Sequence, residues 1–175
     1  PETMDRPDAP DPTAWGLHGA IHREVPQARC LMHVHSHYAT VLASLEDSSM
    51  PPIDQNTMRF FGRIAIDDGF DGMGLGDEAE RVAALMGDKP ILIMGNHGVM
   101  VTGETIAQTF DELFYFERAC QTLITAMMTG RALRIASDDV AMKTAQQWLD
   151  YPQFADMHLK ELKAILDDEE PEYRA

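Results

Sequence analysis

Two patterns of apolar residues follow one another along the chain. Short apolar runs are typical of strands, and they lie at 31–34, 62–66, 90–94 and 99–102. Longer stretches repeat their apolar residues at helical spacing and predict helices at 13–25, 38–45, 53–61, 77–86, 106–129, 137–149 and 152–166. Because short strands alternate with helices, the sequence predicts an α/β fold.

The two ends of the chain lack this periodicity. The first 12 residues hold four prolines and four acidic residues, so we expect a flexible lead-in at 1–12, with Thr13 as the cap of the first helix. The acidic stretch at 167–175 is expected to fray in solvent. The residues between these ends, 13–166, are predicted to form one domain. Its glycine-rich segment at 67–76 is predicted to be a loop, which either covers an active site or is an ordinary crossover connection.

Histidines stand at the ends of two predicted strands. His33 and His35 follow the first run, and side chains two apart in a strand lie on one face, with His37 there too if the strand continues. His97 follows the run at 90–94 and is the best candidate for a third ligand. Three imidazoles with an open position are typical of a catalytic zinc site, whereas strand-end histidines are also common as hydrogen-bonded rim residues.

Two neighbouring features bear on this site. His18 and His22 are four residues apart and lie on one face of a predicted helix, as two zinc-binding histidines of a metalloprotease do. Gly19 stands where a metalloprotease carries glutamate, so the sequence argues against a protease site. We expect His18 to be a hydrogen-bonding residue near the metal and His22 to lie at the surface. The helix that begins after His37 should present its first amides to an anionic substrate group.

Charge and composition narrow the class of protein. The 175 residues include 14 basic and 29 acidic ones, for a formal net charge of -15. Such a surface disfavours nucleic acid and anionic membranes as partners. There is no apolar run of about 20 residues and no basic-then-apolar leader, so we expect a cytoplasmic protein. The two cysteines, Cys30 and Cys120, are expected to be buried free thiols, with a disulfide as the alternative.

Three segments resemble the class II aldolase/adducin family: LHGAIHREVPQARCLMHVH at 17–35, IMGNHGVMVTGET at 93–105 and FYFERAC at 114–120. The resemblance extends from about residue 13 to about residue 128. It implies a three-layer α/β/α sandwich and a homotetramer with metal sites near its subunit interfaces. It also implies that His33, His35 and His97 bind a divalent metal, usually zinc, although three imidazoles also accept Mn²⁺, Fe²⁺ or Co²⁺.

The chain departs from the family pattern in two places. Catalytic aldolases of the family carry a glutamate that binds the metal and moves the substrate proton, and Ala14 stands at that position. We therefore expect His18, His37 or Tyr38 to handle the proton. The family domain also begins further upstream with a turn that contacts a substrate phosphate or carboxylate, so we expect this chain to lack the family's N-terminal part. Glu117 forms either an ion pair with Arg118 or another subunit, or a bond to a ligand histidine.

The function expected from these features is a metal-dependent, aldolase-like lyase. It would cleave a carbon–carbon bond in a small hydroxy-carbonyl or hydroxy-acid substrate through a metal-stabilised enediolate. Two alternatives stay open: a non-catalytic, adducin-like scaffold, and a decarboxylase or epimerase that uses the same metal site.

Overall fold

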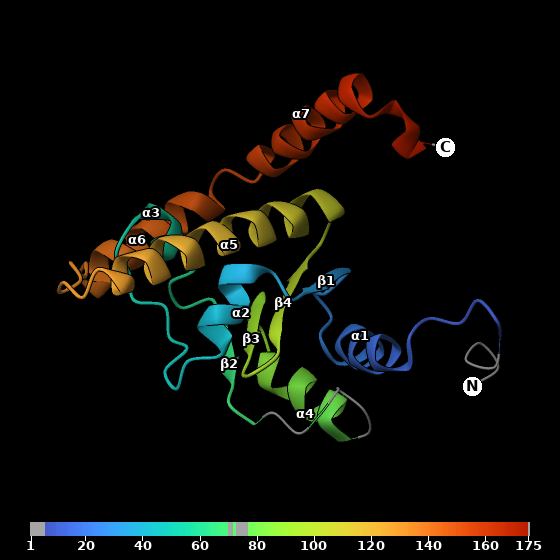
Figure 1. The fold of residues 1–175 in the computed structure, drawn as a ribbon, viewed down its shortest axis with the longest axis horizontal. Coiled ribbons are helices and arrows are strands. Elements are labelled where there is room, and N and C mark those ends of the chain that lie inside the picture. Colours follow the sequence, from blue (N-terminus) through green and yellow to red (C-terminus); the bar gives the residue numbers. More distant parts are fainter. Residues whose placement is uncertain (1–5, 70–71, 73–76, 175) are drawn as a thin grey trace.

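The computed structural model describes residues 6–69, 72 and 77–174. Within them a four-stranded sheet has the order β1-β4-β3-β2 (Figure 1). Its strands are β1 (Cys30–Val34), β2 (Ile64–Asp67), β3 (Ile91–Met94) and β4 (Gly98–Gly103). The β2–β3 pair is parallel and the other two pairs are antiparallel, so the sheet is mixed.

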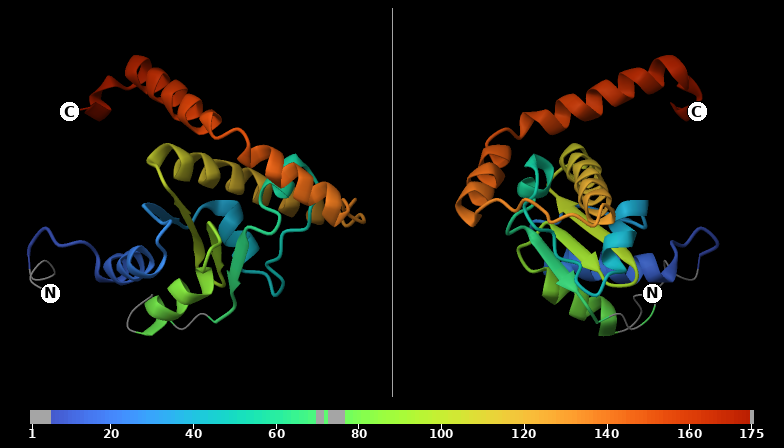
Figure 2. Two further views of the ribbon diagram at one scale, coloured as in Figure 1. Left: turned by 180° about the vertical axis from the view of Figure 1, so that it is seen from behind. Right: turned by 60° about the vertical axis from the view of Figure 1, so that its left-hand side comes forward.

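Helices cover both faces of the sheet (Figures 1 and 2). Their bounds are α1 (Pro12–Glu24), α2 (His37–Ala43), α3 (Gln55–Arg59), α4 (Asp77–Met86), α5 (Ile106–Met128), α6 (Asp138–Leu149) and α7 (Gln153–Glu169). Alternate residues of β3 face opposite sides: Leu92 and Met94 pack with α1 and α4, while Ile91 and Ile93 pack with α2 and α5. The three-layer α/β/α arrangement is therefore confirmed.

Buried charges join the helices on the α5 side. Arg59 of α3 donates through Nη2 to the Asp111 carboxylate of α5 at 2.6 Å, and both side chains are more than nine-tenths buried. His158 of α7 lies with its Nδ1 2.7 Å from the other Asp111 oxygen. The α7 helix contacts α5 and extends away from it towards the C-terminus (Figure 2). This cluster links α3, α5 and α7 without contributing to the sheet.

The first and last α-helices of the described chain extend beyond their predicted bounds. Asp11, not Thr13, caps α1: its carboxylate accepts from the Thr13 amide at 2.9 Å, and Pro12 takes the first helical position, where no amide donor is needed. The described part of 167–175 is helical in the structure, and its fraying in solvent stays a prediction. Helix α7 continues to Glu169, a short 3₁₀ helix follows at Pro171–Arg174, and the Tyr173 hydroxyl donates to Asp167 at 2.5 Å.

Other elements bear out or adjust the predictions. Asp54 caps α3, because its carboxylate accepts from the Thr57 amide at 2.9 Å. Cys120 is a buried free thiol, while Cys30 is free but only half-buried. Most of the glycine-rich segment, 70–71 and 73–76, lies outside the described residues. In the part of the chain that the structure describes, none of the helices combines the length and the apolar character needed to cross a bilayer.

Candidate metal centre

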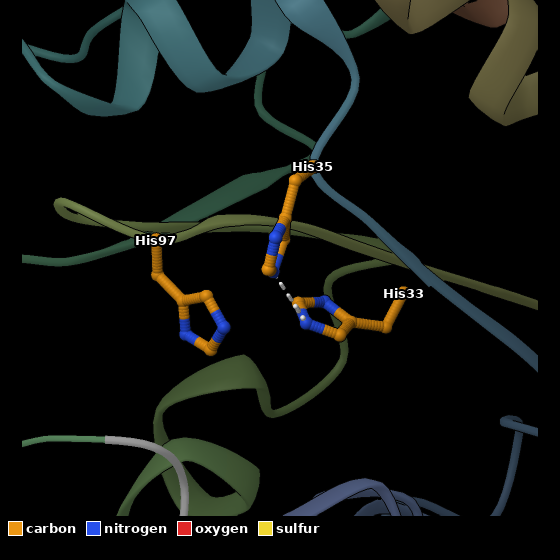
Figure 3. Close-up of side chains that lie close together, drawn as sticks. All are labelled: His33, His35 and His97. Carbon is orange, nitrogen blue, oxygen red and sulfur yellow. Dashed lines mark hydrogen bonds between the residues drawn. The ribbon is translucent and has the colours of Figure 1, made fainter.

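The three histidines meet where the ends of neighbouring strands come together. His33 lies in β1, His35 directly follows it, and His97 lies in the turn that joins β3 to β4, the strand beside β1. Their ring centroids are 4.8–5.0 Å apart. One ring nitrogen from each lies within 4.8 Å of the others, and the rings point into a common space (Figure 3). The three side chains form a cluster that could hold a metal ion.

Backbone contacts hold the turn that carries His97. The Gly95 amide donates to the Asp67 carbonyl at 2.7 Å, and the Asn96 amide donates to the Ala43 carbonyl at 2.9 Å. Asn96 adopts a φ of 56°, a left-handed conformation that asparagine tolerates better than most residues. The turn is therefore fastened to both β2 and α2 immediately before His97.

Gly98 allows the two histidine-bearing segments to approach closely. A Cβ at this position would lie 2.6 Å from the Val34 carbonyl oxygen and 2.7 Å from Cδ2 of His35. We expect Gly98→Ala to lower the free energy of unfolding by about 1–3 kcal/mol, the usual cost of overpacking, and to displace His35. Urea unfolding and metal titration check both effects.

Gly19→Ala is the matched control for this prediction. Gly19 lies inside α1, and a Cβ there would meet nothing within 4 Å. The same chemical change should therefore raise stability by about 0.5–1 kcal/mol through helix propensity. Equal effects of the two substitutions would contradict the steric account of Gly98.

Hydrogen bonding sets the tautomer of His33. Its Nδ1 lies 3.1 Å from the Val99 carbonyl oxygen, which only accepts, so Nδ1 carries the proton and Nε2 keeps a lone pair. The Nε2 atoms of His33 and His35 are 3.2 Å apart. Two nitrogens that bind one tetrahedral Zn²⁺ at ordinary bond lengths lie roughly 3.3–3.4 Å apart. The donor set and its spacing therefore fit a divalent metal.

Burial favours the neutral, metal-binding form of these imidazoles. The pKa of His33 is lowered to about 4, mainly by burial. The hydrogen bond to the Val99 carbonyl raises this pKa, and the nearby rings of His97, His35 and His18 lower it. Burial and the ring of His35 also lower the pKa of His97, while the carboxylate of Glu78 opposes this shift. His33 is therefore neutral at pH 7 before any metal binds.

The lowered pKa of His33 predicts how the stability of the metal-free protein depends on pH. In the unfolded chain His33 takes up a proton near pH 6.5, but in the folded protein it does so only near pH 4. The contribution of neutral His33 to the free energy of unfolding is therefore fully present above pH 6.5 and is lost as the pH falls from 6.5 to 4. Urea unfolding with a chelator present, at pH 7 and pH 5, should show a larger loss for wild type than for His33→Gln. Equal losses would contradict the assignment.

A pocket of about 640 Å³ opens beside the cluster. Its lining combines the three histidines with apolar and polar residues, namely Asp11, Thr13, Ala14, Leu17, Val34, Gly72 and Asn96. Ala14 thus faces the same space as the histidines. Asp11 supplies a carboxylate that the sequence analysis missed, because it assigned 1–12 to the lead-in. The capping sequence Asp-Pro before a helical pattern was the signal that could have revealed it.

Among the residues that the structure describes, the lining of this pocket includes none of the three predicted proton-handling residues. His18 is half-buried on α1, and its charge is felt by His33. His37 is exposed at the start of α2, and its ring meets that of Tyr38 edge-on, with centroids 4.9 Å apart. β1 ends at Val34, so His37 does not extend the face shared by His33 and His35. Their catalytic roles stay predictions.

The first amides of α2 are already occupied. The carboxylate of Glu117 accepts from the amides of Tyr38 and Ala39 at 2.8 and 2.9 Å. The expected anion site at this helix start is therefore wrong, because a side chain of the protein neutralises it. In the part of the chain that the structure describes, Glu117 bonds to Ser36, Tyr38 and Ala39 and forms neither the predicted ion pair with Arg118 nor the predicted bond to a ligand histidine; an ion pair with another subunit stays a prediction.

The fold and the histidine cluster define a class: an α/β protein with a candidate metal centre at the edge of its sheet. The chain belongs to a known family, because residues 2–124 match the model of the class II aldolase and adducin N-terminal domain. The family resemblance stated from the sequence is therefore confirmed.

Individual relatives agree with this assignment. A Caulobacter vibrioides protein whose name assigns it to aldolase class 2 is 31% identical over 122 residues, 69% of this chain and 47% of that protein. Beta-adducin of Homo sapiens is 32% identical over 123 residues, again 69% of this chain but 16% of adducin. A crystal structure of an aldolase II superfamily protein from Pseudomonas syringae has a TM-score of 0.82 at 27% identity, covering 93% of this chain and 66% of that one. The chain spans about half the length of the first curated relatives it matches.

Proposed function

We propose that the chain is a metal-dependent lyase of the aldolase type, acting on a small hydroxy-carbonyl or hydroxy-acid substrate. The observation that carries the proposal is the convergence of three imidazoles on a pocket large enough for a small molecule. A divalent metal held by His33, His35 and His97 would act as a Lewis acid and stabilise negative charge that develops on substrate oxygens. Zinc is the metal we propose, because three nitrogen ligands with an open position suit it.

The protein's own residues supply binding and proton transfer in this proposal. Leu17 and Val34 give the pocket apolar walls against which the carbon chain of a small substrate would pack. With alanine at position 14, the proton must be carried by another group. We propose His18 first, because its charge acts on the ligand histidine His33, and His37 or Tyr38 next.

Two other functions remain candidates, each for a specific reason. A decarboxylase on the same site is favoured by Ala14, since loss of carbon dioxide requires no proton abstraction before the bond breaks; an epimerase there is the variant of this candidate that Ala14 does not favour. A scaffold is favoured by the 32% identity to beta-adducin. A scaffold has no chemical need for a cluster of three imidazoles, so we place the lyase first. A homotetramer and a cytoplasmic location remain predictions of the sequence.

Incubation with a panel of small hydroxy-acids and hydroxy-ketones tests the reaction. Carbonyl products are trapped with a hydrazine reagent, and released carbon dioxide is measured in parallel. We expect zinc-dependent carbonyl release that a chelator stops and that His97→Ala lacks. Carbon dioxide without a second carbonyl product would favour the decarboxylase, and no turnover by a metal-loaded protein with any substrate would favour the scaffold.

A further inference from the structure

His35 lies outside the regular elements, in the two-residue connection between β1 and α2. The ladder of β1 ends with Val34 opposite Val99, and α2 begins at His37, so His35 has no strand partner. The neighbouring His33 differs, because it lies within the ladder and its ring is bonded to a carbonyl of β4.

The ring of His35 depends on its backbone for its position. Among the residues that the structure describes, no hydrogen bond joins this ring to the backbone, and its ring contacts are with His33 and His97. The side chain is exposed, so packing constrains it little. Whatever fixes the turn at His35 and Ser36 therefore fixes the direction in which the imidazole points.

Glu117 fixes that turn from the far side. Its carboxylate accepts from the Ser36 hydroxyl at 2.7 Å, the Tyr38 amide at 2.8 Å and the Ala39 amide at 2.9 Å. Ser36 occupies the cap position of α2 but makes no capping bond with its own side chain. Bonds to an ionised carboxylate are stronger than neutral ones, and a negative charge is favourable at a helix start.

The backbone of Glu117 is itself rigidly placed. It lies in the middle of the 23-residue helix α5, next to Phe116 and close to Ala119 and Cys120, which are all fully buried in the core. The carboxylate is therefore a fixed point to which the His35 turn is attached. β1 holds the turn on one side and Glu117 holds it on the other.

We propose that Glu117 is a positioning residue for the metal centre: by binding the start of α2, Glu117 holds His35 at ligand distance. The inference rests on the proposed metal centre. Glu117→Gln replaces one acceptor oxygen by an amide that faces N–H and O–H donors, so the turn loosens. We expect affinity for Co²⁺ or Zn²⁺ to fall about 10–100-fold, the usual range for residues that orient metal ligands.

The test is a titration of chelator-treated protein with Co²⁺ alone, at a temperature where circular dichroism shows that wild type and variant are both folded. Co²⁺ reports its ligands through visible absorption, so we expect Glu117→Gln to bind more weakly and with an altered spectrum. Ser36→Ala removes one of the three bonds and should cause a smaller loss. Glu161→Gln, the same change at an exposed position of α7, should leave binding unaltered.

The outcomes separate this inference from the metal centre itself. If wild type and Glu117→Gln bind Co²⁺ equally and with the same spectrum, Glu117 is only a helix cap and the inference is wrong, whatever the variant's stability. If wild type binds neither Co²⁺ nor Zn²⁺, the proposed metal centre fails. If Glu117→Gln does not fold, Ser36→Ala decides, and wild-type affinity in that variant would overturn the inference.

Discussion

Zinc is expected to raise the melting temperature of the wild-type protein by about 5–10 °C at a free concentration 100-fold above its dissociation constant. A ligand that binds only the folded state stabilises by about 2.7 kcal/mol at this concentration, and each kcal/mol shifts the melting temperature of a protein of this size by roughly 2–4 °C. His33→Ala/His97→Ala should show no shift, because a single imidazole of the cluster remains. Differential scanning fluorimetry with and without zinc measures both.

A matched variant guards against zinc binding elsewhere. His22 lies on α1, outside the cluster, with its Nδ1 2.6 Å from the Ala28 carbonyl oxygen. His22→Gln removes an imidazole without touching the proposed ligands, so its zinc-dependent shift should equal that of wild type. A shift that disappears in His22→Gln, or that persists in the double variant, would contradict the assignment of ligands.

Asp111→Ala is expected to lower the free energy of unfolding by about 3–5 kcal/mol, the range for breaking a buried ion pair. The change removes the partner 2.6 Å from Arg59 Nη2 and the acceptor for His158. Glu112, 3.3 Å from Arg59 and 3.1 Å from Arg63, is left to neutralise two guanidinium groups. One buried positive charge then has no counterion. Urea unfolding monitored by circular dichroism measures the loss.

The exposed pair of Arg6 and Asp8 provides the comparison. Its nitrogen and oxygen are 2.7 Å apart, but both side chains are more than three-fifths exposed. Water and salt screen such pairs, so Asp8→Ala should leave stability unchanged within error. A loss for Asp111→Ala as small as that for Asp8→Ala would show that the buried cluster does not hold α3, α5 and α7 together.

The sequence predicted the parts of the site that depend on short-range geometry. The spacing of His33 and His35 placed them on one face because alternation in a strand is a local property. Apolar periodicity likewise located every α-helix and strand that the structure describes, with differences at their ends, but not the 3₁₀ helix at Pro171–Arg174. The ends shift because caps and pairing decide them: Asp11 starts α1 one residue early, and β1 stops at Val34 where its pairing with β4 stops.

Contacts between distant residues could not be predicted in this way. Glu117 could be recognised as a charge within an apolar helix, but its partners lie about 80 residues earlier, and only the packing of α5 against α2 reveals them. The pairing of Arg59 with Asp111 depends in the same way on how α3 docks on α5. His97 was predicted as the third ligand from its place after an apolar run and from the family resemblance, but the adjacency of β1 and β4, which brings it to His33 and His35, is seen only in the structure.

The most direct test of the metal centre is elemental analysis of purified wild-type protein after zinc loading and extensive dialysis. The account predicts about one zinc ion per chain, falling to background in His33→Ala/His97→Ala. Wild-type protein that is folded but retains no zinc or other divalent metal would contradict it, and would leave the three histidines without the role that the proposed function gives them.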